Sequence, residues 1–492
     1  MTALLALLVV PLFGALAAIA LSGRAAGVAV WAATLVTVAA ALALVFPVGP
    51  PGIVTLELGG WAPPLGIALA ADGLSVALIV MSALVMLGAG LAAHHSIGPA
   101  GEGGRMAFGF WPLMLLLWAA LNAVFLSRDL FNLYVGIELL SLAAVGLVAI
   151  DGKARAYAAA IRYLVYALAG SLLYLGGVVL TYAAHGTLDM GLLAARSPAV
   201  SDGLALALMT AGLMAKTALF PFHVWLPPAH GSAPAPASAM LSALVPKASF
   251  VILLRLWLEA MPDRASDGAL LLLALLGVSA VVWGSLRAIA QTRLKLVVAY
   301  STVAQIGYLF VVFPLVGATG GDLTFRSDAW NGLVLLILSH GLAKSAMFLT
   351  VGQWMNVTGS DAFDRLRGLA VAMPISVFGF ALAAVTLAGL PPSGGFTAKY
   401  LIMTAAFVSG QWVWALVMAG GGLLAAIYLY RPMAALFARS APPETITVST
   451  SRQLVPLALA TASIALGFLA AGLLEMLPSG LPGPPAISGE GS

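Results

Sequence analysis

The sequence predicts an all-α membrane protein with about fourteen transmembrane helices, arranged as two inverted five-helix repeats that each contain one broken helix. The first observation is composition: 62% of the 492 residues are hydrophobic and 8% are charged, whereas roughly a quarter of an ordinary soluble domain is charged. The second is a series of long apolar runs, and the third is that proline and glycine interrupt two of them. A water-soluble enzyme is therefore excluded.

Fourteen mostly apolar runs are candidate spanning helices, which need roughly 20 residues each. Short segments rich in glycine, proline and charge separate the runs. They cover residues 2–21, 27–46, 73–93, 108–126, 130–150, 156–184, 203–222, 239–257, 267–290, 294–316, 331–353, 373–409, 411–431 and 454–475.

Positive charge is distributed unevenly between the loops that these runs define. The loops after even-numbered helices hold four basic residues: Arg128, Arg196, Arg264 and Arg326. The loops after odd-numbered helices hold twelve: Arg24, Arg105, Lys153, Arg155, Arg287, Arg293, Lys295, Arg365, Arg367, Arg431, Arg439 and Arg452. The positive-inside rule then places the odd loops in the cytoplasm and both termini on the outer face. We expect a multi-pass protein of a bacterial inner (plasma) membrane.

Two runs contain helix breakers. In the seventh, Pro221 begins a proline-rich stretch, and in the twelfth the sequence LPPSGGFTAKY places four breakers inside a segment that must still cross the membrane: Pro391, Pro392, Gly394 and Gly395. Such breaks free backbone groups at depth, which is tolerable only where protein or a water-filled cavity can satisfy them. Both interrupted runs also carry a lysine, Lys216 and Lys399, which favours a functional break over a packing kink.

The two breaks are separated by five helices. Because five is odd, a repeat of that length must be inverted in the membrane, and pairing helices 4–8 with helices 9–13 superimposes the breaks. Inverted repeats with discontinuous helices are typical of transporters. We therefore expect N-terminal helices in 1–107, a first repeat in 108–257, a second in 258–431, and a last helix with a tail in 432–492.

Six basic residues fall inside the apolar runs, while Glu138 is the one acid near the middle of a run. A charge at the bilayer centre costs at least ~2.5 kcal/mol, and such residues usually mark an ion pathway. The six are Arg162, Lys216, Lys247, Arg255, Lys344 and Lys399. Arg255 lies near a helix end, where we expect it to snorkel to the interface. Arg162 is either a similar anchor or part of a relay.

Glu138 needs a cation, or it will take up a proton. Lys216 lies at similar depth on another helix and is the expected partner. Each residue would hold the other charged, and separating them would favour release of the lysine's proton. This predicts a switch; the alternative is a static buried salt bridge that stabilises the fold.

Further titratable residues could extend a proton path. His340 and Lys344 are four residues apart and share one helix face, and Lys247 follows Pro246. Lysines in one site of low dielectric cannot all be charged together, so protons can step between them through ordered water. His223, His230 and His340 could serve as intermediate stations, or each could be a hydrogen-bonded packing residue.

Other chemistries lack support. The chain has no cysteine, which removes thiolate metal ligands and iron–sulfur ligands, so any electron transfer belongs to a partner. His94 and His95 have no carboxylate companion at metal-binding spacing. The sequence therefore predicts no cofactor and no metal site, and a net charge of +4 over 492 residues is too dilute for nucleic-acid binding.

Five ordered segments within Phe108–Arg431 resemble the antiporter-like proton-translocating subunits shared by respiratory complex I, group 4 membrane-bound hydrogenases and Mrp-type cation/proton antiporters. They are FNLYVGIELLSL, AKTALFPFHVWLPPAHGSAPAPASAMLSALVPKA, LKLVVAYSTVAQIGYL, LILSHGLAKSAMFL and LPPSGGFTAKYL. The resemblance implies fourteen helices with two inverted halves. By motif it also implies a proton path through Glu138, Lys216, Lys247 and Lys399, with His340 as the helix 11 histidine and Lys344 close by.

The segments favour different branches of that family. GIELLSL resembles the quinone-proximal subunit of complex I, whereas the segment from WLPPAHG to VPKA resembles the D-type component of Mrp antiporters and hydrogenase-type subunits, which we favour. We thus expect a subunit that moves protons, with sodium exchange as an option, inside a multi-subunit membrane complex and that is not catalytic alone. The alternatives are a coupling module of a complex I-like NADH-quinone oxidoreductase or hydrogenase, and a stand-alone carrier of an organic solute.

Overall fold

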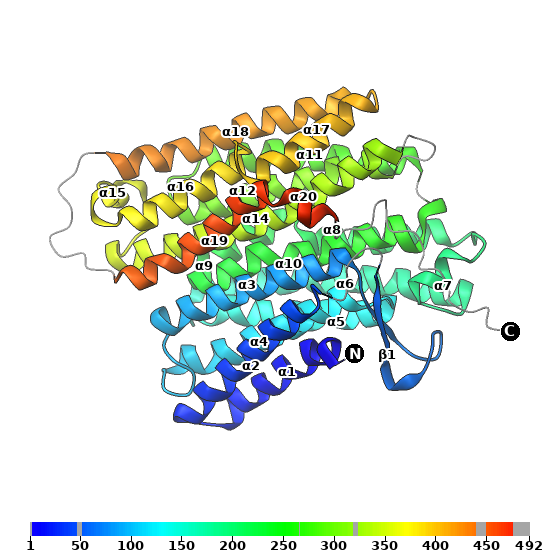
Figure 1. The fold of residues 1–492 in the computed structure, drawn as a ribbon, viewed down its shortest axis with the longest axis horizontal. Coiled ribbons are helices and arrows are strands. Elements are labelled where there is room, and N and C mark those ends of the chain that lie inside the picture. The colour runs from blue at the N-terminus through cyan, green and yellow to red at the C-terminus, as the bar shows by residue number, and fades with distance from the viewer. Residues whose placement is uncertain (1, 47–51, 265, 318–322, 439–448, 476–492) are drawn as a thin grey trace.

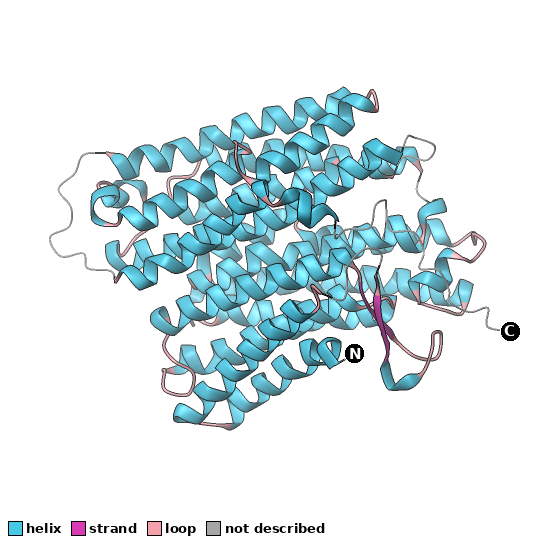
Figure 2. Cartoon of the chain, viewed as in Figure 1, coloured by secondary structure: helices cyan, strands magenta, loops and turns pink. Residues whose placement is uncertain are grey.

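The computed structural model describes residues 2–46, 52–264, 266–317, 323–438 and 449–475. Long helices lie side by side with nearly parallel axes and alternate in direction (Figure 1), and helices make up nearly all of the regular structure (Figure 2). In the described part of the chain, thirteen helices are long and apolar enough to cross a membrane. Two shorter ones, α16 (Pro374–Ala388) and α17 (Gly394–Val408), follow each other and form one further crossing. The predicted fold class is confirmed.

Three helices precede the repeats: α1 (Thr2–Ala20), α2 (Gly23–Ala43) and α3 (Gly73–Ser96). Between α2 and α3, a hairpin of β1 (Val54–Glu57) and β2 (Ala68–Ala71) pairs antiparallel, with Val54 opposite Ala71. The hairpin lies at the same end of the bundle as the N-terminus (Figure 1).

The remaining helices follow the predicted order. The first half has α4 (Arg105–Leu126), α5 (Leu130–Ala149), α6 (Ala154–His185), α7 (Met190–Ala194), α8 (Asp202–Thr217), α9 (Leu226–Ser232) and α10 (Ala235–Arg255). The second half has α11 (Asp267–Ile289), α12 (Leu294–Val311), α13 (Phe313–Val316), α14 (Leu323–Thr358), α15 (Leu369–Ala372), α16, α17 and α18 (Trp412–Phe437). After them come α19 (Thr450–Phe468) and α20 (Ala470–Glu475). Arg439 and the tail of the predicted segment 432–492 beyond Glu475 lie outside the described residues.

The two halves repeat one packing arrangement. In the first, α4 packs on α5, α5 on α6, α6 on α8, and α8 on α10. In the second, α11 packs on α12, α12 on α14, α14 on α16, and α17 on α18. The most hydrophobic windows of the α10 and α14 spans are completely buried, so polar side chains on these two central helices are shielded from lipid.

Both predicted breaks are present, and both begin with a left-handed cap. α8 is capped by Ala218 (φ 60°), whose N–H donates to the carbonyls of Met214 and Ala215, and a short 3₁₀ turn, η2 (Phe222–Trp225), then leads into α9. α16 is capped in the same way by Gly389 (φ 77°). Closing each helix by such a cap satisfies carbonyls that would otherwise be orphaned inside the membrane.

Candidate functional site

The first cluster of the site joins α5 and α8. Lys216, in the last turn of α8, lies 3.2 Å from the carboxylate of Glu138 and donates to the hydroxyl of Ser141 at 2.8 Å. The Lys216 side chain is 4% exposed and that of Glu138 is 21% exposed. The predicted pair therefore exists, with its cation buried and its carboxylate partly open.

The second cluster centres on Lys247, which is fully buried in α10. Its neighbour Pro246 has no N–H, so the carbonyl of Ser242 loses its helical donor. The Lys247 ammonium takes that place and donates to Ser242 O at 2.5 Å. The Ser242 hydroxyl in turn hydrogen-bonds Thr302 on α12 at 2.8 Å. The Pro-Lys dipeptide thus holds the cation against its own helix and couples it to α12.

Lys344 on α14 reaches the same part of α12. Its ammonium donates to the carbonyl of Val298 at 2.9 Å and to the hydroxyl of Ser301, and Thr302 donates to that same carbonyl at 3.1 Å. Both lysines are therefore tied to α12, Lys344 directly and Lys247 through Ser242, whose carbonyl receives the ammonium and whose hydroxyl bonds Thr302. His340, one turn earlier, is also buried, and its ring nitrogens have no hydrogen-bond partner within the described part of the chain.

Lys399 on α17 forms the third cluster. Its ammonium donates to the carbonyl of Ala388 at 3.3 Å and lies 4.7 Å from the centre of the Tyr308 ring on α12. Gln305, also on α12, donates to the adjacent carbonyl of Leu387 at 3.0 Å. Because residues 301, 305 and 308 share one helix face, α12 presents a polar stripe between Lys344 and Lys399.

We call the set Glu138, Lys216, Lys247, His340, Lys344 and Lys399 the polar row. Sequence reasoning did not assign Gln305 or Tyr308 to it. The signal was available, because Ser301, Thr302, Gln305 and Tyr308 recur at helical spacing in an otherwise apolar segment.

The remaining candidates lie in different places. His230, at 1% exposed, is stacked on Phe348 at a centroid distance of 5.0 Å and is subject to the positive charges of buried lysines of the row. His223 instead accepts a hydrogen bond from Trp283 on α11 at 3.0 Å. Arg162 is exposed on α6. The structure thus brings His230 to the row but leaves His223 and Arg162 apart from it.

The expectation that Arg255 snorkels is wrong. Arg255 is 1% exposed and binds Asp72 at 3.0 Å and Glu259 at 2.8 Å, while Arg128 bridges the same two carboxylates. Burial would raise the pKa of Asp72, but Arg255 and Arg128 hold that pKa well below its usual range. Glu259 is four residues from Arg255, a local spacing that the sequence offers, but Asp72 and Arg128 come from distant parts of the chain, and no local pattern indicates the four-charge network.

The assignment of Lys295 to a loop is also wrong. Lys295 lies in the first turn of α12 and is only 3% exposed. Its ammonium donates to the carbonyl of Ala233, which ends α9. A lysine at a helix start can reach inward along its own stem, and the facing α9 terminus, with its partial negative charge, makes that direction favourable.

Broken helices that meet buried titratable residues inside the membrane are typical of ion-transporting membrane proteins, and they place this protein in that class. The comparison with protein families agrees: residues 127–425 match the family described as NADH:quinone oxidoreductase/Mrp antiporter, TM. This match covers more than half of the chain, and the chain belongs to that family.

Relatives from both branches are similar to this chain. The N-type component of NADH-quinone oxidoreductase from Desulforudis audaxviator is 37% identical over 393 residues, which is 78% of this chain and 75% of the relative. The D-type component of the Na(+)/H(+) antiporter from Alkalihalophilus pseudofirmus is 29% identical over 76% of this chain and 74% of the relative. A chain in the Mrp complex from Dietzia sp. DQ12-45-1b superimposes with a TM-score of 0.86 at 26% identity, covering 96% of both chains.

Proposed function

We propose that this chain moves protons across the membrane along the polar row, as one subunit of a multi-subunit membrane complex. The observation that carries the proposal is the polar stripe of α12, which touches or adjoins Lys247, Lys344 and Lys399 and so connects the centre of the first half to the broken helix of the second. These three lysines come from three different helices and are buried around α12. A purely structural protein would not need three buried cations there.

The chemistry follows from the shortage of acids. Within the row, four lysines share a low-dielectric interior with the single carboxylate of Glu138. Adjacent ammonium groups repel, so the gain of a proton at one favours the loss of a proton at the next. Hydroxyls, carbonyls and intervening water supply the short steps between them. Protonation changes at Glu138 and Lys216 would thereby pass to Lys399 and the opposite face.

The orientation follows from the loop charges. We place the basic end of the bundle in the cytoplasm and both termini on the outer face of a bacterial inner membrane, because the described basic loops gather at the end away from the β-hairpin. The similarity to the Na(+)/H(+) antiporter component from Alkalihalophilus pseudofirmus supports an exchange of sodium for protons.

A second candidate is a proton-pumping or coupling subunit of a complex I-like oxidoreductase. It is favoured by the 37% identity to the NADH-quinone oxidoreductase component, which exceeds the 29% to the antiporter component. Under both candidate functions the polar row carries protons, and only the source of energy for transport differs.

Proton flux in everted vesicles that contain the native complex tests the proposal. Wild type is compared with Glu138→Ala and Lys399→Ala at matched protein levels, and Arg162→Ala, which removes an exposed charge, is the control. Flux driven by added sodium and lost in both row variants would establish antiport. Flux that requires an electron donor would establish a redox-driven pump, and loss of assembly in the row variants would instead support a structural bridge.

A further inference from the structure

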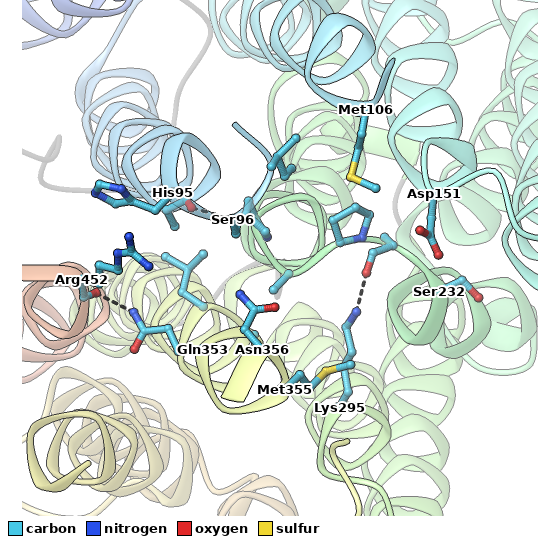
Figure 3. Close-up of a pocket in the computed structure, with 18 of the residues that line it drawn as sticks. His95, Ser96, Met106, Asp151, Ser232, Lys295, Gln353, Met355, Asn356 and Arg452 are labelled. Carbon is cyan, nitrogen blue, oxygen red and sulfur yellow. Dashed lines mark hydrogen bonds between the residues drawn. The ribbon is translucent and has the colours of Figure 1, made fainter. Parts of the chain in front are cut away.

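A cavity of about 470 Å³ opens at the basic end of the bundle, among the ends of α3, α9, α12, α14 and α19. Figure 3 shows polar side chains around it from each of these elements. They include His95, Ser232, Lys295, Gln353, Asn356 and Arg452. A space of this size with several polar groups is roomy enough for ordered water.

Lys295 forms part of the cavity wall and points to the junction of α9 and α10 (Figure 3). Its ammonium donates to the carbonyl of Ala233. The nearby carboxylate of Asp361 is occupied elsewhere, because it accepts from the Lys295 backbone N–H at 3.1 Å and from Arg293 at 2.9 Å. Asp151, which also lines the cavity, is paired with Lys153 at 2.8 Å. Both carboxylates attract the Lys295 ammonium through space, but within the described residues neither forms an ion pair with it.

The Ala233 carbonyl links the cavity to the interior. It also accepts from the Ser238 hydroxyl at 3.3 Å, which contacts the carbonyl of His230 at 3.1 Å. One turn further along α10, Ser242 bonds Thr302 and its carbonyl receives Lys247. The buried imidazole of His230 lies within the electrostatic range of Lys295, Lys344 and Lys247.

We infer that this cavity is a water-filled proton entrance and that Lys295 is its first titratable station, passing protons through His230 to Lys247 and Lys344. Lys295 gives its proton inward and takes another from cavity water, so each transfer is balanced. Neither Glu138 nor Lys216 lines the cavity, and the route therefore meets the polar row at its centre. The inference rests on the proposed function, since it supplies protons to that same row.

Water access is tested by cysteine labelling, for which a chain without native cysteine is well suited. Ser232→Cys and Asn356→Cys place single thiols on the cavity wall, and Leu172→Cys, at a position 68% exposed on the outside of α6, is the control. A membrane-impermeant, charged thiosulfonate should label both cavity thiols from the basic side only and slow proton flux. Absence of labelling, or labelling at Ser232→Cys that leaves flux unchanged, would overturn the inference.

Substitutions at Lys295 separate proton transfer from a tie between helices. Lys295→Met and Lys295→Arg should each reduce flux by about 10-fold or more, equivalent to a rise of about 1.4 kcal/mol or more in the rate-limiting barrier. Lys295→His, whose side chain can still gain and lose a proton, should retain a measurable part of the wild-type flux. Arginine keeps the charge and the hydrogen bond, so full flux in Lys295→Arg would show a structural tie and refute the relay.

Two references complete the design. Arg24→Met removes the same charge at the start of α2, at a side chain that is 97% exposed and does not line the cavity, and should leave flux near wild type. Lys247→Met reports on the polar row itself. If Lys247→Met abolishes flux while the Lys295 variants do not, the entrance is refuted and the proposed function stands. If Lys247→Met also has no effect, the proposed function fails.

Discussion

Each broken helix carries a lysine, Lys216 before the break in the first half and Lys399 after the break in the second, and the two halves balance its charge in different ways. Lys216 faces a carboxylate at 3.2 Å. Lys399 has a carbonyl at 3.3 Å and the face of Tyr308, with no acid bound to it in the described structure. A pair holds its charges in place, whereas a cation supported by dipoles and a ring quadrupole can lose its proton without leaving a counter-ion behind. We propose, on the basis of this difference, a gate in the first half and a release site in the second.

The caps of the two breaks differ in a related way. Ala218 adopts the left-handed conformation in the first half, and Gly389 adopts it in the second. A Cβ at position 389 would lie 2.7 Å from Cδ of Lys399. Glycine at this cap therefore adopts the left-handed conformation without strain and also leaves room for the Lys399 side chain. The cap at Ala218 does not have to leave such room for Lys216.

The largest expected effect is a contrast between Lys216→Met and Lys399→Met. Both should abolish proton flux, but Lys216→Met should lower the free energy of unfolding by about 3 kcal/mol because it strands the Glu138 carboxylate. We take the low end of the usual range because Glu138 is 21% exposed. Lys399→Met should leave stability unchanged or higher. Denaturant unfolding in detergent measures both.

The double variant Glu138→Gln/Lys216→Met is the control for this contrast. It removes both charges, so stability should recover while flux stays absent. If Lys399→Met destabilises the protein as much as Lys216→Met does, the charges of the two lysines are balanced in the same way, and the proposed difference between the halves is wrong.

Gly389→Ala should have the next largest effect. The methyl group would enter the space of the Lys399 stem, and a left-handed alanine costs about 1–2 kcal/mol. We expect flux to fall by about 10-fold, the equivalent of about 1.4 kcal/mol in the barrier. Gly420→Ala on α18, where a Cβ would meet nothing within 4 Å, is the matched control. Equal flux in the two variants would show that Lys399 has room to spare.

Substitution of Tyr308 tests what holds the Lys399 cation. Tyr308→Leu removes the ring and should lower flux by about 5-fold, because a buried cation–π contact contributes about 0.5–2 kcal/mol. Tyr308→Phe keeps the ring face and should stay close to wild type. Proton flux at matched expression distinguishes the two variants. If Tyr308→Phe lost as much flux as Tyr308→Leu, the effect would come from the hydroxyl and not from the ring face.

The sequence predicted the spans, the two breaks and the Glu138–Lys216 pair because these depend on local features: apolar length, Pro and Gly, and a rare acid at depth. It could not predict the environments of Arg255 and Lys295. Asp72 lies 183 residues from Arg255 in the chain, and the carbonyl that receives Lys295 comes from the end of α9, 62 residues away. Whether a cation near a helix end turns to water or inward is decided by such distant partners.

The smallest expected effect returns to the caps. Ala218→Gly should raise the free energy of unfolding by up to about 1 kcal/mol, because the relief of a left-handed alanine outweighs the greater backbone entropy that glycine gives the unfolded chain. Flux should not change, since Lys216 is held by Glu138 and Ser141 and not by the space at the cap. Thermal unfolding together with a flux assay checks both statements. Altered flux in Ala218→Gly would mean that the first break is tuned as closely as the second, and the asymmetry between the halves would then be confined to the charge that balances each lysine.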